Sequence, residues 1–211
     1  MKIEVKNVNK KFGQVTALKD VSVTFETGKI YGLVGRNGSG KSVFLKIVCG
    51  FYKPTSGEVL FDGENIMANN KFPPDTRALI EKPCFMPQLT GYENLKLLAD
   101  IQHRIGKEEI IKSLEEVNLV DAKDKLYFTY SLGMKQKLGI AQVLMEDPEV
   151  MIFDEPFNGI ERETANKLRK KLNSIKKNKI IIIASHIKED IDELADVVYE
   201  FDDGNLSKYK K

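Results

Sequence analysis

The chain has few of the features that mark secreted or membrane-spanning proteins. Its 211 residues include only two cysteines, Cys49 and Cys84, which lie far apart with no second metal ligand nearby, so neither a disulfide framework nor a zinc site is expected. The first residues carry charges where a signal peptide needs an apolar stretch, and the longest aliphatic run, residues 180–184, is too short to span a bilayer. We therefore expect a cytoplasmic chain that does not cross a membrane by itself.

An excess of charge of one sign is also missing. The 33 Lys and Arg residues nearly balance 31 Asp and Glu residues, and a formal net charge of +2 is too small to indicate nucleic acid as a partner. The composition, with 42% hydrophobic and 30% charged residues, is that of an ordinary globular protein long enough to bury a core. A short basic tail, Lys208, Lys210 and Lys211, is interpreted as solvated.

The hydrophobic pattern predicts strands at the start of the chain and a boundary further on. Alternating apolar residues over 3–5 and 21–25 predict half-buried antiparallel strands. An apolar run over 30–34 then leads through a glycine-rich loop into helical spacing over 41–48. Four of the seven prolines fall between residues 73 and 87, which indicates a boundary between two lobes.

The second half of the chain is predicted to be helical first and then α/β. Thr90 and Glu93 predict a capping box at the start of a helix, and apolar spacing continues in helical steps up to about residue 145. Continuous apolar runs over 150–153 and 180–184 predict strands of a parallel sheet that is covered on both faces. Helical spacing after each of them, the second over 187–198, predicts a return to a βαβ layout.

The glycine-rich loop fits the phosphate-binding pattern G-x-x-x-x-G-K-[ST] between a predicted strand and a predicted helix. Its glycines let backbone N–H groups turn toward a β-phosphate, and the helix N-terminus adds the positive end of its dipole. The lysine is placed to reach the β- and γ-phosphates, and the serine hydroxyl to bind Mg²⁺. The alternative, an ordinary glycine-rich turn, requires neither the strand nor the helix. The predicted nucleotide-binding residues here are Gly35, Arg36, Asn37, Gly38, Ser39, Gly40, Lys41 and Ser42.

Two acids, Asp154 and Glu155, follow the strand predicted over 150–153. This places both carboxylates at the carboxyl edge of the sheet, where α/β proteins bind ligands. Asp154 can hold Mg²⁺ through water, while Glu155 can orient or deprotonate the water that attacks the γ-phosphorus of ATP. The alternative is a strand end with solvated charges, which is common for such pairs where no phosphate loop lies upstream.

Residues 130–136, Tyr-Ser-Leu-Gly-Met-Lys-Gln, resemble the LSGGQ signature of the nucleotide-binding domains of ABC transporters, and the resemblance covers nearly the whole chain. Ser131 is a suitable N-cap and Gly133 permits a close backbone approach, so this helix end can bind the γ-phosphate held by a second subunit. As a bare string the segment also fits a capped surface helix. Its position shortly before Asp154 and Glu155 favours the first interpretation.

Other residues match the family one position at a time. Phe12 is similar to the aromatic residue that stacks on adenine, although a core phenylalanine is the alternative. His186 follows a predicted strand, like the family's switch histidine that contacts the γ-phosphate, whereas a lone histidine is usually structural. The resemblance therefore implies Glu155, His186 and Lys41 as the catalytic residues. Residues 158–161 resemble the loop that communicates between the two composite sites of the family's dimer.

Several positions depart from the family. Glu81 stands where the family usually has a glutamine that binds Mg²⁺ and senses the membrane partner; a carboxylate also binds the metal, so the predicted metal ligands are Ser42, Glu81 and Asp154. Leu132, Met134 and Glu161 also differ from the usual residues. The combination of Glu81 with the segments 85–94 and 130–134 resembles the bacitracin-resistance and lantibiotic-immunity branch of exporters.

The resemblance implies an α/β fold: a P-loop NTPase with a RecA-like core and mixed sheet, an N-terminal antiparallel β-subdomain and an inserted α-helical subdomain. The expected boundaries within an ABC ATP-binding domain of residues 1–211 are about 1–29 for the β-subdomain, 30–70 and 146–211 for the core, and 71–145 for the helical subdomain.

The same resemblance implies a subunit that binds and hydrolyses ATP with Mg²⁺ and powers a separately encoded membrane permease, for export of a hydrophobic compound or a peptide antibiotic. It implies an ATP-dependent dimer with a second cassette and a location at the inner face of the cell membrane. Cys84, Phe85 and Met86 are candidates for docking the permease, with burial between the lobes as the alternative. The alternative functions are a soluble ABC ATPase outside transport and a regulatory cassette with weak hydrolysis.

Overall fold

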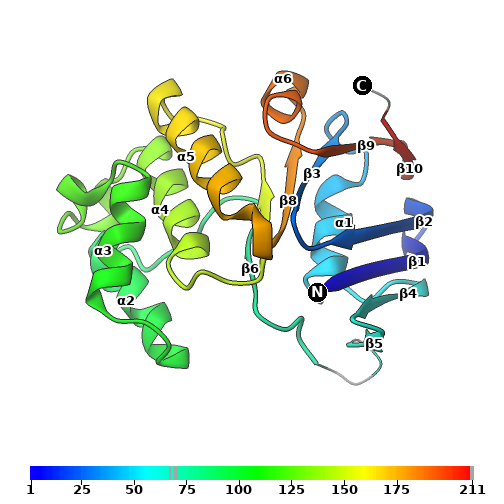
Figure 1. Ribbon diagram of the computed structural model, residues 1–211, viewed down its shortest axis with the longest axis horizontal. Coiled ribbons are helices and arrows are strands. Elements are labelled where there is room, and N and C mark those ends of the chain that lie inside the picture. The colour runs from blue at the N-terminus through cyan, green and yellow to red at the C-terminus, as the bar shows by residue number, and fades with distance from the viewer. Residues whose placement is uncertain (67, 69–70, 210–211) are drawn as a thin grey trace.

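The computed structural model describes residues 1–66, 68 and 71–209, which form two sheets and a lobe of helices (Figure 1). Lys210 and Lys211 of the basic tail lie outside the described residues. The first sheet is antiparallel with the strand order β2-β1-β4-β5. The predicted alternation is confirmed, because Ile3 pairs with Phe25 across it. Its strands are β1 (Lys2–Phe12), β2 (Val15–Glu26), β4 (Ser56–Phe61) and β5 (Glu64–Asn65).

The second sheet is the mixed sheet that a RecA-like core requires. Its strand order is β10-β9-β3-β8-β7-β6, in which β10 runs antiparallel to β9 and the other neighbours are parallel. The turn into β10 contains Asp203 and Gly204, both with positive φ. Its strands are β3 (Lys29–Val34), β6 (Thr76–Leu79), β7 (Val150–Asp154), β8 (Ile180–Ser185), β9 (Val197–Asp202) and β10 (Asn205–Lys208).

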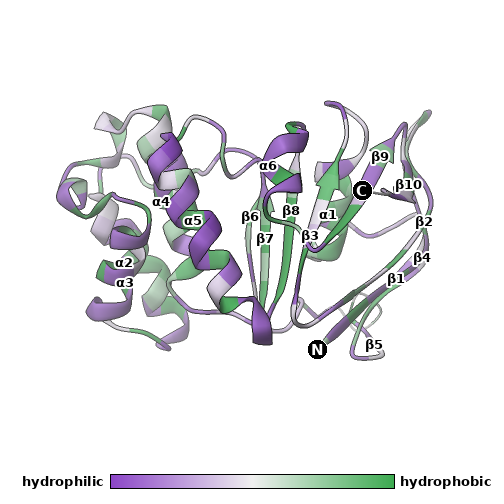
Figure 2. Ribbon diagram, turned by 45° about the horizontal axis from the view of Figure 1, so that its top comes forward, coloured by the Kyte–Doolittle hydropathy of each residue, from purple (hydrophilic) through white to green (hydrophobic). Residues whose placement is uncertain are grey.

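Successive side chains of β8 enter two different cores. Ile181 and Ile183 belong to the core that the sheet shares with the helical lobe, while Ile180 and Ile182 belong to the core shared with α1 (Lys41–Val48) and the antiparallel sheet. Because successive residues of a strand point to opposite faces, a strand covered on both faces is apolar at every position. Figure 2 shows this as hydrophobic colour along β7 and β8, in contrast to the hydrophilic α5.

The helical lobe covers one face of the mixed sheet, and α1 lies on the other (Figure 1). The predicted capping box is present at the start of α2: Thr90 Oγ1 accepts from Glu93 N at 3.1 Å, and Glu93 Oε2 accepts from Thr90 N at 2.7 Å. In the described part of the chain, no helix has both the length and the apolar composition for crossing a membrane. The remaining helices are α2 (Gly91–Gln102), α3 (Lys107–Glu116), α4 (Leu132–Leu144), α5 (Arg162–Ile175), α6 (Lys188–Asp192) and the short 3-10 helices η1 (Val120–Ala122), η2 (Tyr127–Thr129) and η3 (Lys176–Asn178).

The expected subdomain boundaries need correction at two strands. Residues 56–65, which we expected in the core, form β4 and β5 of the antiparallel sheet. Residues 76–79, which we expected in the helical subdomain, form β6 and pair with β7 in the mixed sheet. The helix expected over 187–198 is also shorter, because α6 ends at Asp192. In all three places the structure depends on contacts with segments distant in the sequence. The local spacing of hydrophobic residues does not indicate such contacts.

Candidate functional site

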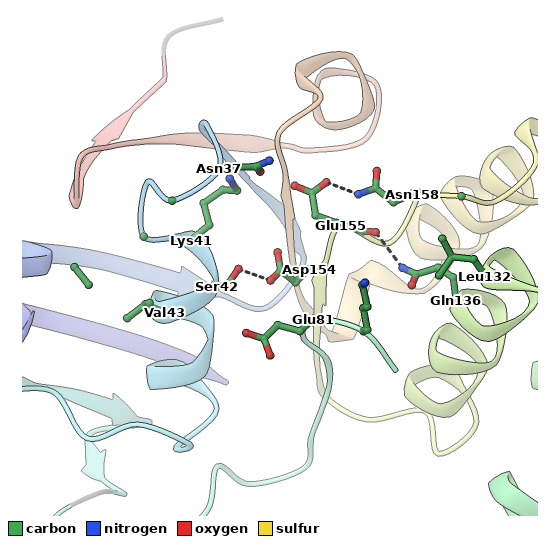
Figure 3. Close-up of a pocket in the computed structure, with 15 residues that line it drawn as sticks. Asn37, Lys41, Ser42, Val43, Glu81, Leu132, Gln136, Asp154, Glu155 and Asn158 are labelled. Carbon is green, nitrogen blue, oxygen red and sulfur yellow. Dashed lines mark hydrogen bonds between the residues drawn. The ribbon is translucent and has the colours of Figure 1, made fainter. Parts of the chain in front are cut away.

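A cavity of about 550 Å³ lies between α1, the carboxyl end of β7 and the start of α4 (Figure 3). Ser42 and Asp154, 112 residues apart in the sequence, meet at the cavity wall through a hydrogen bond. The predicted phosphate loop and the predicted hydrolytic acids therefore line one space. The lining residues are Ala17, Asn37, Gly38, Gly40, Lys41, Ser42, Val43, Glu81, Lys82, Leu132, Gln136, Asp154, Glu155, Asn158 and Gly159.

The loop before α1 has the shape of an anion cradle. Gly38 and Gly40 have φ of +81° and +110°, which glycine adopts readily. A Cβ on Gly40 would lie 2.8 Å from the Ala17 carbonyl oxygen, whereas the space beside Gly38 is open. Within the described residues, the buried Ser39 Oγ has no hydrogen-bond partner. A buried, unpaired hydroxyl in a glycine-rich loop at a helix N-terminus fits the oxygens of a phosphate group.

Lys41 holds its ammonium group inside this loop. Nζ donates to the carbonyl oxygens of Gly35 at 2.6 Å and Arg36 at 3.1 Å. Burial lowers the pKa of Lys41 from its ordinary value, while the nearby Glu155 and Asp154 carboxylates act in the opposite direction. Phosphate oxygens are stronger acceptors for an ammonium group than neutral carbonyls. Lys41 is therefore placed to exchange its backbone partners for a phosphate.

The predicted metal ligands form a set of oxygen donors. Ser42 Oγ donates to Asp154 Oδ2 at 2.6 Å. Burial raises the pKa of the Asp154 carboxyl, and the hydrogen bond from Ser42 opposes this shift. Glu81 lines the same cavity, with its carboxylate paired to Lys46 of α1.

This donor set fits Mg²⁺ in the presence of a nucleotide. Mg²⁺ prefers oxygen ligands and is usually held by one or two carboxylates together with substrate phosphates. No group of three or more His, Cys, Asp or Glu residues that could hold a metal ion occurs in residues 1–66, 68 and 71–209. The oxygens of Ser42, Asp154 and Glu81 are thus suited to a cation that arrives with phosphate ligands of its own.

Glu155 is held by four contacts beside the cavity. Its Oε1 accepts from the His186 backbone N at 2.8 Å and lies 2.8 Å from His186 Nδ1. Its Oε2 accepts from Ser185 Oγ at 3.2 Å and from Asn158 Nδ2 at 3.4 Å. The Glu155 backbone has φ of +53°, a conformation that a glutamate rarely adopts and that is often found at functional sites. These neighbours orient the carboxylate, and the Glu155 side chain is still 22% exposed to solvent.

Six predicted nucleotide-binding residues lie outside the cavity lining: Gly35, Arg36 and Ser39 of the phosphate loop, and Phe12, Ser131 and Gly133 elsewhere in the chain. Phe12 is 43% exposed, which argues against a core role, and its ring meets Tyr52 edge-on with centroids 5.6 Å apart. Ser131 caps α4 as predicted, its Oγ accepting from Met134 N at 3.2 Å. A Cβ on Gly133 would lie 2.4 Å from the Gly159 carbonyl oxygen, so within this chain the glycine lets the loop 158–161 come close. Its approach to a phosphate of a second subunit stays a prediction.

The sequence did not predict the partners of Glu155 and Glu81. Gln136 Nε2 donates to the Glu155 carbonyl oxygen at 3.0 Å. Ser185 and Asn158 donate to the carboxylate of Glu155. Lys46 was also missed, although its position four residues after Ser42 places both on one face of α1. That spacing is the signal in the sequence that could have indicated it.

Residues 18–158 match the family that is described as ABC transporter. This range includes the phosphate loop, residues 130–136 and the two acids Asp154 and Glu155. The chain belongs to this family. It is the ATP-binding subunit of an ABC transporter and an ATPase, as the resemblance implied.

Individual relatives agree with the predicted branch and fold. The bacitracin transport ATP-binding protein BcrA of Enterococcus faecalis is 38% identical over 207 residues, 97% of this chain and 67% of that protein. The lantibiotic transport ATP-binding protein SrtF of Streptococcus pyogenes is 34% identical over 200 residues, 93% of this chain and 85% of that protein. A solved structure of the ATP-binding subunit of an ABC transporter superposes with a TM-score of 0.89 at 25% identity, covering 100% of this chain and 90% of that one. The predicted resemblance to the bacitracin and lantibiotic branch and the predicted fold are confirmed.

Proposed function

We propose that this cassette hydrolyses Mg·ATP at the cavity between α1 and β7 and thereby powers export by a separately encoded membrane permease. The observation that carries the proposal is the hydrogen bond of Ser42 to Asp154 beside the anchored Glu155. This arrangement brings a phosphate cradle, a pair of metal ligands and a general base together in one cavity.

The roles follow from the chemistry of each side chain. Lys41 and the backbone N–H groups of residues 38–42 bind the phosphates, and Ser42, Asp154 and Glu81 hold the metal. Mg²⁺, when bound with ATP, neutralises negative charge that develops on the phosphates. Glu155 accepts the proton of the attacking water, and His186 Nδ1, 2.8 Å from its Oε1, keeps that carboxylate in position.

A second cassette completes the site in this proposal. Ser131 and Leu132 are exposed at the N-terminus of α4, which is free to meet a phosphate of another subunit. Gly133 contacts Gly159 in the loop that also holds Glu155 through Asn158. This contact gives a physical connection between the helix end that faces the partner and the general base of the same chain.

The membrane partner is proposed to dock near residue 86, at the inner face of the membrane. Phe85 is half-buried, with its ring 5.4 Å from that of Tyr127, so burial within the lobe accounts for it. Met86 is 50% exposed beside it, and Asn94 fixes its backbone by accepting from Met86 N at 2.8 Å. The names of BcrA and SrtF support a peptide antibiotic as the exported compound.

Phosphate release from Mg·ATP by the purified chain tests the proposal. We expect Lys41→Ala to weaken ATP binding by about tenfold to hundredfold, because a charge-assisted contact is lost. Lys96→Ala on α2, which removes the same charge from an exposed ion pair with Asp100, is expected to behave like the wild type. Equal loss in both variants, or no hydrolysis by the wild type with or without its permease, would contradict the proposal.

A further inference from the structure

Glu81 and Lys46 form an ion pair at the edge of the nucleotide cavity. Lys46 Nζ donates to Glu81 Oε1, and the lysine side chain is only 19% exposed although the glutamate is 62% exposed. The Glu81 backbone is in the left-handed region with φ of +63°, the same unusual region as Glu155. Both glutamates that line the cavity thus have a conformation that costs energy and needs support from their surroundings.

The position of Lys46 is set by the rigid helix that carries the phosphate-binding residues. It lies on α1 four residues after Ser42, and its neighbours Leu45 and Ile47 are fully buried between the two sheets. Its Nζ lies 5.3 Å from the centroid of the Tyr52 ring, within the range of a cation–π contact. A lysine is a cation at neutral pH, so its contact with Glu81 joins opposite charges.

The charges that face Glu81 explain what this cation does. Asp154 lies across the same cavity and is close enough to interact electrostatically with Glu81, and Glu155 adds a third carboxylate. Lys82 lines the cavity from the same segment. An unpaired Glu81 would add a full negative charge where the phosphates bind, whereas a Glu81 paired with Lys46 is nearly neutral, like an amide.

We propose that Lys46 is a positioning residue for Glu81, which it neutralises in the empty site and releases when the metal binds. The inference rests on the proposed function, in which Glu81 faces the metal of Mg·ATP. Since the ion pair and Mg²⁺ use the same carboxylate, they compete for it. Lys46 therefore sets how much Mg²⁺ is needed for tight nucleotide binding, and it lets a glutamate occupy this position.

The test is a double-mutant cycle of Lys46→Met and Glu81→Gln, in which nucleotide affinity is measured and ATP turnover is not. The affinity for a non-hydrolysable ATP analogue is measured by calorimetry over a series of Mg²⁺ concentrations, and the half-saturating Mg²⁺ concentration is compared. We expect Lys46→Met to lower that concentration about twofold to fivefold, the range for breaking a partly exposed ion pair. In the Glu81→Gln background, the same substitution should leave it unchanged.

Two further variants separate positioning from general effects. Lys46→Arg keeps the cation and is expected to stay close to the wild type, while Lys96→Met removes a paired lysine far from the cavity and should change nothing. An equal Mg²⁺ shift in both Glu81 backgrounds, or no shift in Lys46→Met, would overturn the inference while the proposed function stands. If Mg²⁺ does not strengthen nucleotide binding by the wild type, the proposed function fails as well.

Discussion

Replacing Glu155 by glutamine is the sharpest test of the hydrolytic machinery, because it removes a charge and a proton acceptor at almost unchanged size. An amide oxygen in the place of Oε1 can keep both contacts with His186, each 2.8 Å long. The amide nitrogen in the place of Oε2 then faces Asn158 Nδ2, which is also a donor. The substitution thus removes the weak 3.4 Å contact with Asn158 and requires the Ser185 hydroxyl, which donates to Oε2 at 3.2 Å, to turn and accept instead.

The expected effect on the reaction is much larger than the effect on the fold. A positioned general base contributes typically about 10²–10⁴-fold, so steady-state phosphate release should fall by this factor. The free energy of unfolding should change by only about 1 kcal/mol, the scale of one altered hydrogen bond. The phosphate contacts of Lys41 and the loop are untouched, so Mg·ATP should still bind, and a dimer should persist in its presence.

The assay compares phosphate release, nucleotide affinity and the elution volume of the protein with and without Mg·ATP. Glu189→Gln, an exposed position at the start of α6 near His186, provides the matched control and should retain full activity. Hydrolysis at the wild-type rate by Glu155→Gln would refute the assignment of the base. Loss of nucleotide binding together with hydrolysis would show that Glu155 acts through the structure of the site instead.

Two further substitutions test the structural reasoning. Gly133→Ala places a Cβ 2.4 Å from the Gly159 carbonyl oxygen. We therefore expect this variant to lose about 1–3 kcal/mol of stability in urea unfolding and to hydrolyse ATP more slowly. The control is Gly106→Ala, whose Cβ meets only a glutamate oxygen at 3.7 Å and which should change hydrolysis little. In Asp75, burial acts to raise the carboxyl pKa, but hydrogen bonds from Arg104 and the Glu149 N–H outweigh it, and the pKa is lowered. Its stabilisation is therefore complete above the unfolded pKa of about 3.9 and is lost as the pH falls through the lower folded value. Asp75→Asn should cost about 1–2 kcal/mol at pH 7 and much less at pH 3, and an equal difference at both pH values would contradict this account.

Local patterns predicted those parts of the structure that depend on neighbours in the sequence. The capping box of Thr90 and Glu93 needs only four consecutive residues, and it is present as expected. The apolar run of β8 indicated a strand buried on both faces, because no solvated face interrupts it. The phosphate loop was predictable for the same reason, since one strand, one turn and one helix start form it.

The sequence by itself determined the periodicities of the strands and helices, the cradle, and the acids that end β7, because backbone geometry and short motifs act over a few residues. Tertiary structure alone decided that β4 joins the antiparallel sheet, that β6 joins the mixed sheet and that Gly133 rests on Gly159. It also decided that Lys46 meets Glu81, 35 residues further along the chain. These contacts join segments that are far apart in the sequence, so no local period records them, and they form only in the folded chain.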